Sequence, residues 1–190
     1  MKGAVIKLRH VLKLSRCNHR KEILKQSNLK TAHIYCKINH LSGQVSGPLI
    51  EYYIQNKYKM AKNKSSLCIG DLQRKKINYE IKVSNGGREN NKFNYVQLRL
   101  NHKCEYLLTA YYIDDCNLKQ MGELFIFKLN KLNMKKLIVK FGGYAHGTIK
   151  KLGTITAKDL DNKNNKEYAI RPTYGDKCWK ELLKFRIEDI

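Results

Sequence analysis

The segment of residues 69–83 contains two acidic residues and a lysine in a pattern that can bind a metal ion. Asp71 follows a short apolar run, and Glu80 and Lys82 alternate with apolar residues in INYEIKVS. Because successive side chains of a β-strand point to opposite faces, we expect Glu80 and Lys82 to project together while their apolar neighbours pack into the core. A hairpin between the two apolar runs would bring the carboxylate of Asp71, at the end of the first strand, beside that of Glu80.

These residue types suit the hydrolysis of a phosphodiester bond. Mg²⁺ prefers a few carboxylate oxygens together with water and phosphate oxygens. It lowers the pKa of a coordinated water and neutralises charge in the transition state, and a neighbouring ammonium group can position that water. We therefore expect Asp71 and Glu80 to be metal ligands and Lys82 to assist the nucleophile. The competing interpretation is a surface ion pair between Glu80 and Lys82 on a half-exposed strand, with Asp71 in a turn.

Apolar periodicity and turn residues predict the elements that position this group. The run SGP at 46–48 favours the start of a helix over residues 48–60, with Glu51 in its first turn. Residues 67–73 and 77–84 are expected to form a hairpin through the basic turn RKK. A glutamate in a first turn is also favoured by the helix dipole alone, so a purely structural role for Glu51 stays open.

Farther along the chain, apolar segments predict the rest of a central sheet. Strands are expected at EYLLTAYYID, GELFIFKLN and KLIVKFGG, and a closing helix at CWKELLKFRIEDI. Residues 93–102 fit a helix or a strand equally well, and residues 1–45 are expected to form one or two short elements. The pattern predicts an α/β or α+β fold.

The combination of Gly70-Asp71 with Glu80-Ile81-Lys82 resembles the PD-(D/E)XK nuclease superfamily, to which most type II restriction endonucleases belong. Gly70 stands where that family often has proline. Glu51 matches a glutamate that the family commonly places on the helix before the first core strand. The resemblance covers about residues 46–115 and implies a restriction-endonuclease-like core, in which helices flank a central mixed β-sheet. It also implies Mg²⁺ as cofactor, with Glu51 as a third acidic group near the metal.

Several basic and polar residues near the predicted site are candidates for contacts with DNA. Phosphate contacts could come from loop residues and from the segment after the loop: Lys75, Lys76, Arg88, Lys92, Gln97 and Arg99. Solvated loop charges or an exposed face explain each of them as well. His146 in GGYAHGT could bind a metal, but this run matches no P-loop spacing, and a glycine-rich turn between strands is the preferred interpretation.

The charge of the chain points to a polyanionic partner. Its 38 Lys and Arg against 16 Asp and Glu give a formal net charge of +22, which favours binding to nucleic acid through counterion release. An A/T-rich genome would also enrich Lys, so the charge alone does not prove binding. At 190 residues, of which 42% are hydrophobic, the chain is expected to form one domain over 1–190.

Cysteine usage and hydropathy predict a soluble, cytoplasmic protein. The 6 Cys contain no CxxC pair and no zinc-finger spacing to a histidine, so reduced cysteines are expected. No stretch approaches the length and apolarity of a membrane span, and residues 1–22 lack the apolar core of a signal peptide. The basic, amphipathic start of the chain could instead act as a transit peptide or a membrane-surface helix.

Three classes of function fit the sequence: a restriction-type endonuclease acting on double-stranded DNA, a nuclease of repair or RNA processing, and a non-catalytic basic binding protein. Within the first class, the short chain favours the small cleaving subunit of a heterodimeric type IIS restriction enzyme, whose larger partner would recognise the site and nick the other strand. A self-sufficient homodimeric type IIP enzyme is the alternative, with base-reading loops from residues 152–174.

Overall fold

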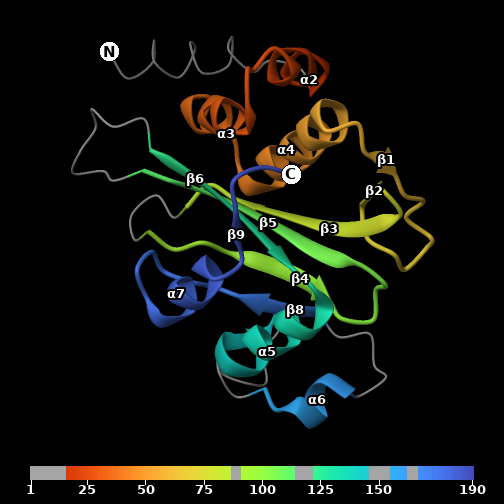
Figure 1. Cartoon of the computed structure of the whole chain (residues 1–190). Coiled ribbons are helices and arrows are strands. Elements are labelled where there is room, and N and C mark those ends of the chain that lie inside the picture. The colour runs from red at the N-terminus through yellow and green to blue at the C-terminus, as the bar shows by residue number, and fades with distance from the viewer. Residues whose placement is uncertain (1–15, 87–90, 114–121, 146–154, 162–166) are drawn as a thin grey trace, which may run out of the picture.

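The computed structural model describes residues 16–86, 91–113, 122–145, 155–161 and 167–190 (Figure 1). The helices are α2 (Arg16–Leu24), α3 (Leu29–Ile38), α4 (Gly43–Lys57), α5 (Lys131–Phe141), α6 (Ala157–Asp161) and α7 (Lys177–Leu183). The strands are β1 (Ala61–Lys62), β2 (Leu72–Arg74), β3 (Ile77–Ser84), β4 (Tyr95–Arg99), β5 (Glu105–Tyr112), β6 (Glu123–Leu129), β7 (Gly142–Tyr144), β8 (Glu167–Ile170) and β9 (Arg186–Ile187).

Two sheets form the framework. The larger has six strands in the order β1-β2-β3-β5-β6-β9, and β3 and β5 are parallel while its other pairs are antiparallel. The smaller is antiparallel with the order β4-β8-β7. Helices α2, α3 and α4 lie on one side of the large sheet, and the small sheet with α5 and α7 lies on the other (Figure 1). The expected α+β class, with a mixed sheet flanked by helices, is confirmed.

Alternation along the central strands explains the two layers of core. In β5, Leu107 packs with the helices α2–α4, whereas Tyr106 and Leu108 pack with the small sheet. The same rule divides β6, where Ile126 faces the helices and Phe127 faces the other side. A strand that is buried on both faces must be apolar at nearly every position, as EYLLTAYY is. This central strand fixes the position of β3, its parallel neighbour.

Several predicted elements differ from the observed ones. The segment KLIVKFGG is not a strand: residues 131–141 form α5, whose buried Met134, Leu137 and Ile138 follow helical spacing, and only the glycines enter β7. The short apolar run LIV resembles a strand and obscures the helical spacing of these buried residues. Residues 93–102, left undecided, contain β4, and the closing helix α7 ends at Leu183 before β9.

The first helix of the predicted core also starts earlier than expected. Helix α4 begins at Gly43 after Ser42, so Pro48 lies inside it rather than in its first turn, although proline has no N–H for the helical hydrogen bond. Glu51 therefore lies in the third turn, where the helix dipole gives no reason for an acidic residue. None of the described helices combines the length and apolarity that crossing a membrane requires.

Candidate active site at the edge of the six-stranded sheet

The short β2 pairs with only part of one edge of β3, whose other edge pairs with β5. Lys75 and Lys76 form its two-residue turn with φ of 49° and 66°, the left-handed conformation that such tight hairpins need. Pairing then runs back only as far as Leu72 opposite Tyr79, whereas β3 continues to residue 84. From Glu80 onward, one edge of β3 therefore has no paired strand among the described residues. The expected hairpin is confirmed, but residues 67–71 of the predicted first strand lie outside β2.

Asp71 takes the place of the missing strand. Its backbone N–H donates to the carbonyl of Tyr79 at 2.8 Å, and its Oδ2 accepts from the backbone N–H of Ile81 at 2.8 Å. Asp71 thus lies just before β2, not at the end of a strand as predicted, and its side chain satisfies a β3 edge donor. This contact holds the carboxylate against β3 at the level of Glu80.

Gly70 allows the chain to turn away at this point. It has φ of +89°, and a Cβ at this position would lie 2.7 Å from the carbonyl oxygen of Tyr79 and 3.0 Å from the Cβ of Cys104. Proline, which fixes φ near −65°, cannot adopt this conformation. The local backbone therefore requires glycine, and not proline, at position 70.

Gly70→Ala is expected to destabilise the protein by about 1–3 kcal/mol, because a left-handed backbone and a close contact would both strain it. It should also displace the carboxylate of Asp71 from the edge of β3. Urea unfolding measures the first effect, and Gly47→Ala is the matched control, since a Cβ at Gly47 meets nothing within 4 Å. Unfolding of Gly70→Ala at the wild-type urea midpoint would show that this turn is not constrained.

Glu80 and Lys82 project from β3 away from the helices, as the alternation predicts, because Tyr79 and Ile81 pack on the helix side. Glu80 is only 1% exposed. The Lys82 ammonium lies 2.7 Å from its Oε1, and His102 Nδ1 lies 3.3 Å from its Oε2. The ion pair between Glu80 and Lys82 that the competing interpretation expects is therefore present, but Glu80 is buried rather than half-exposed.

One oxygen of Glu80 is left without a hydrogen bond. Oε1 is fully buried and has no hydrogen-bond partner of suitable geometry among the described residues, although the Lys82 ammonium is close to it. The Lys82 ammonium at 2.7 Å compensates the charge of this buried oxygen, so Glu80 and Lys82 form a buried ion pair. Carboxylate oxygens such as those of Glu80 and Asp71 are the ligands that a hard divalent ion such as Mg²⁺ prefers.

Glu51 and Asp71 are electrostatically linked to Glu80. Burial raises the pKa of Glu51 above its ordinary value, and the charges of Asp71 and Glu80 add to this effect, against Lys62 and Lys82. Burial, followed by the charge of Glu80, likewise raises the pKa of Asp71, against the hydrogen bond from Ile81. The charges of Asp71, Glu80 and Lys82 thus all act on the carboxyl of Glu51, which lies on α4.

These raised pKa values predict that the acidic group lowers the stability of the fold. When the pKa of a carboxyl is higher in the folded than in the unfolded state, the fold loses stability as pH rises through the interval between these two pKa values. The loss persists at neutral pH. In the absence of divalent ions at neutral pH, Glu51→Gln is therefore expected to raise Tm by about 2–4 °C, the shift that about 1 kcal/mol produces in a domain of this size.

Thermal unfolding with and without Mg²⁺ checks this expectation. Mg²⁺ should raise the Tm of the wild type more than that of Glu51→Gln, because an ion that binds only the folded state stabilises it. Glu188→Gln, which removes a carboxylate that is 89% exposed, is the control and should leave Tm unchanged. A Tm of Glu51→Gln below that of the wild type would contradict the electrostatic linkage.

The residues predicted to contact DNA are scattered. Arg99 lies near the site, with NH1 4.0 Å from Glu80 Oε1, but its Nε and NH2 bind Glu167 at 2.8 and 2.7 Å. Gln97, with φ of 56°, lies in β4 where the pairing with β8 is irregular. The exposed Lys75 and Lys76 occupy the tip of the β2–β3 hairpin, and the exposed Lys92 forms a bridge to Thr173. Arg88 and His146 lie outside the described residues.

Two residues near Glu80 are absent from the sequence-based prediction. The donor atoms of Glu80, His102 and Cys104 lie within 4.8 Å of one another, and in the described part of the chain no other trio of such residues is this close. Glu51, Asp71 and Glu80 form no such trio, so the oxygens of at least one pair among them lie farther apart than 4.8 Å. The spacing His-x-Cys just before β5 is the only local signal, and it becomes meaningful only when β5 is known to pair with β3.

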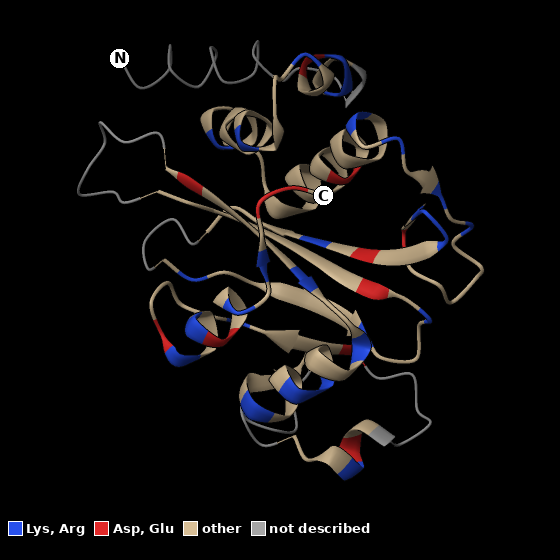
Figure 2. Ribbon diagram, viewed as in Figure 1, with Lys and Arg blue, Asp and Glu red and all other residues tan. Residues whose placement is uncertain are grey.

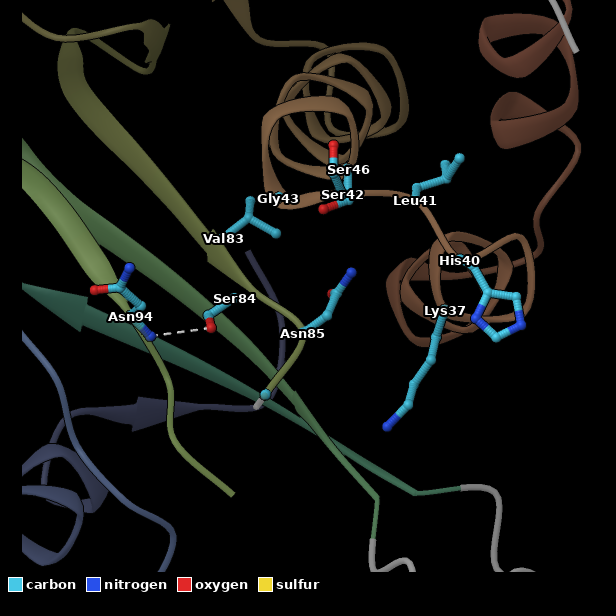
Figure 3. Close-up of a pocket in the computed structure, with 11 residues that line it drawn as sticks. Lys37, His40, Leu41, Ser42, Gly43, Ser46, Val83, Ser84, Asn85 and Asn94 are labelled. Carbon is cyan, nitrogen blue, oxygen red and sulfur yellow. Dashed lines mark hydrogen bonds between the residues drawn. The ribbon is translucent and has the colours of Figure 1, made fainter. Parts of the chain in front are cut away.

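A pocket of about 490 Å³ lies at the other end of β3, where it meets α3 and the start of α4 (Figure 3). Polar residues of its wall include Lys37, His40, Ser42, Asn85 and Asn94. The backbone N–H of Asn94 donates to Ser84 Oγ at 3.2 Å in the wall of this pocket (Figure 3). None of the predicted carboxylates lines it, so it is distinct from the candidate active site.

Comparisons with known proteins do not assign a family. No protein-family model matches the chain, and no match was found among curated proteins or solved structures. The class that can be stated is an α+β protein with a mixed sheet and a buried acidic group at the edge of that sheet. A function must be inferred from the chemistry of this group.

Proposed function

We propose that the chain is a Mg²⁺-dependent endonuclease that hydrolyses phosphodiester bonds of double-stranded DNA. The observation that carries this proposal is the state of Glu80. It is a buried carboxylate with one oxygen lacking a hydrogen bond, an ammonium group 2.7 Å away and a second carboxylate, Asp71, fixed on the same strand edge. A buried carboxylate and ammonium beside a second carboxylate are the groups that a cation and a phosphate would need.

Asp71 and Glu80 would hold the ion, and Glu51 would add negative charge beside them. Mg²⁺ bound there would polarise the scissile phosphate and lower the pKa of an attacking water. The hydrogen bond from Ile81 orients Asp71 before any ligand arrives, which reduces the reorganisation needed at binding.

Lys82 has two expected partners. Without a metal ion its ammonium group neutralises Glu80. Once Glu80 is engaged by the ion, Lys82 can turn to the attacking water or to the phosphate oxygen that gains charge in the transition state. Its side chain is 17% exposed, so it is shielded from bulk water and yet able to reach a bound substrate.

The charge distribution supports a nucleic acid as the substrate. The formal net charge is +22, and basic residues occur on helices on both sides of the large sheet (Figure 2). A field of this kind attracts a polyanion and makes its affinity fall steeply with salt. The unpaired Cys36, Cys68, Cys104 and Cys178 support a reducing compartment, and we propose action in the cytoplasm.

A plasmid assay tests the proposal. Purified chain is incubated with supercoiled plasmid in Mg²⁺ or in EDTA, beside Asp71→Asn and the surface control Glu188→Gln purified in the same way. We expect Mg²⁺-dependent cutting by the wild type and by the control, and none by Asp71→Asn. Equal cutting by all three proteins would reveal a contaminating nuclease and remove the support for this site.

The products also distinguish the biological roles. Discrete linear fragments would indicate a homodimeric type IIP enzyme. Nicked circles, or cutting that begins only when a larger nicking subunit is added, would indicate the small cleaving subunit of a heterodimeric type IIS enzyme, the narrower role that we propose. DNA binding without cleavage under every condition would favour a basic binding protein instead.

A further inference from the structure

Glu80, His102 and Cys104 form a group of three different metal-binding side chains. Their donor atoms lie within 4.8 Å of one another, and His102 Nδ1 is 3.3 Å from Glu80 Oε2. Two ligands of a tetrahedral ion with bonds of about 2.0–2.1 Å lie roughly 3.4 Å apart. The His102–Glu80 spacing is therefore already that of two ligands of one ion.

The chemistry of this trio differs from that of the acidic group. Imidazole nitrogen and thiolate sulfur suit Zn²⁺ and Co²⁺, whereas Mg²⁺ prefers oxygen. The trio also faces the other side of the Glu80 carboxylate: Oε2 is directed to His102, and Oε1 to Lys82. A borderline-soft ion could bind on the Oε2 side while Lys82 stays beside Oε1.

The backbone holds the three residues in place. Parallel pairing sets Glu80 opposite Tyr106, so the loop that precedes β5 lies beside Glu80. That loop is fixed at two points, where the Lys131 ammonium donates to the carbonyl of His102 at 3.2 Å and the backbone N–H of Lys103 donates to the carbonyl of Cys68 at 2.8 Å. Contacts of this kind orient metal ligands before binding.

We propose that Glu80, His102 and Cys104 form a three-ligand site for a transition-metal ion of the Zn²⁺ class, with a fourth position open to water. Binding would release the Cys104 proton, since the thiolate is the ligand. A consequence that rests on the proposed nuclease function is that Zn²⁺ would inhibit Mg²⁺-dependent cleavage, because it would immobilise a carboxylate that both ions need. This site would then make the enzyme sensitive to the balance of metals.

Cobalt spectroscopy tests the site independently of activity. Co²⁺ is titrated anaerobically into the full chain, with a phosphine reductant in place of thiol reagents. We expect a thiolate-to-cobalt charge-transfer band and tetrahedral d–d bands that saturate at one ion per chain and disappear on addition of Zn²⁺. Cys104→Ser should lose the charge-transfer band and lower the affinity by about 100-fold or more, as loss of a ligand or its support does. Cys68→Ser, which changes an exposed cysteine outside the trio, is the control and should keep the band.

Each outcome decides the proposal. A band absent from the wild type, or retained by Cys104→Ser, overturns the site. Thermal unfolding verifies that Cys104→Ser is folded, and His102→Ala gives a second variant whose d–d bands should weaken. Asp71→Asn separates the two ideas: it should lose cleavage and keep the cobalt band. A wild type that never cuts DNA but shows the Cys104-dependent band would therefore support the metal site. It would contradict only the proposed nuclease function and the Zn²⁺ inhibition that rests on it.

Discussion

Glu80→Gln is expected to lower the rate of Mg²⁺-dependent DNA cleavage by about 10³-fold or more. Glutamine keeps the size of the side chain and one carbonyl oxygen, but it removes the charge that would hold the metal ion. Glu80 is the point where the ammonium of Lys82, the ring of His102 and the edge of β3 meet. Its loss should therefore affect metal binding and the placement of Lys82 together.

Single-turnover cleavage of a labelled duplex or plasmid measures this effect. The same substitution leaves the largely buried Lys82 without its anion, so a loss of stability is also expected. Tm must therefore be measured, so that any lost activity can be assigned to folded protein. A calorimetric titration should show weaker Mg²⁺ binding at a temperature well below that Tm. Cleavage by folded Glu80→Gln at the wild-type rate would remove Glu80 from the mechanism.

Lys82→Met is expected to reduce the cleavage rate by about 10²–10⁴-fold while DNA affinity changes little. Methionine retains much of the apolar stem and loses only the ammonium group. Because the charge beside Glu80 disappears, Mg²⁺ binding should stay the same or become tighter. This opposite behaviour of metal affinity and rate separates a role in the chemical step from a role in holding the metal.

Lys180→Met is the control for the loss of one positive charge, since Lys180 is exposed on the outer side of α7. It should bind DNA and cleave it like the wild type. Lys82→Arg should not restore the full rate, because a planar guanidinium cannot occupy the compact position of an ammonium group beside Glu80. If Lys82→Met loses DNA binding in proportion to cleavage, Lys82 acts in substrate affinity and not in catalysis.

The sequence predicted the part of the site that depends on local periodicity. The alternation around Glu80 and Lys82 required a strand with a core face and a polar face, and β3 is that strand. The position of Asp71 was harder to predict from the sequence. β2 is short, and the place where the chain leaves the edge of β3 depends on the conformation of Gly70. The earlier start of α4 was missed because Pro48, a common first-turn residue, lies inside the helix.

Features that depend on pairing between distant segments could not be predicted. His102 and Cys104 reach Glu80 only because β5 pairs in parallel with β3 at a particular register. Neither hydropathy nor residue spacing encodes that register. The ion pair between Arg99 and Glu167 likewise depends on the pairing of β4 with β8. Arg99, which the sequence suggested as a DNA contact, therefore binds a carboxylate of the protein itself.

The most direct test of the acidic group is a crystal structure of the protein soaked in Mn²⁺, with anomalous diffraction locating the ion. Mn²⁺ accepts the same oxygen ligands as Mg²⁺ and can be distinguished from water. We predict an anomalous peak at coordination distance from the carboxylate oxygens of both Asp71 and Glu80, and its disappearance in Asp71→Asn crystals. A fully soaked crystal with no peak between these two carboxylates would contradict the assignment of a divalent-metal active site to this edge of the sheet.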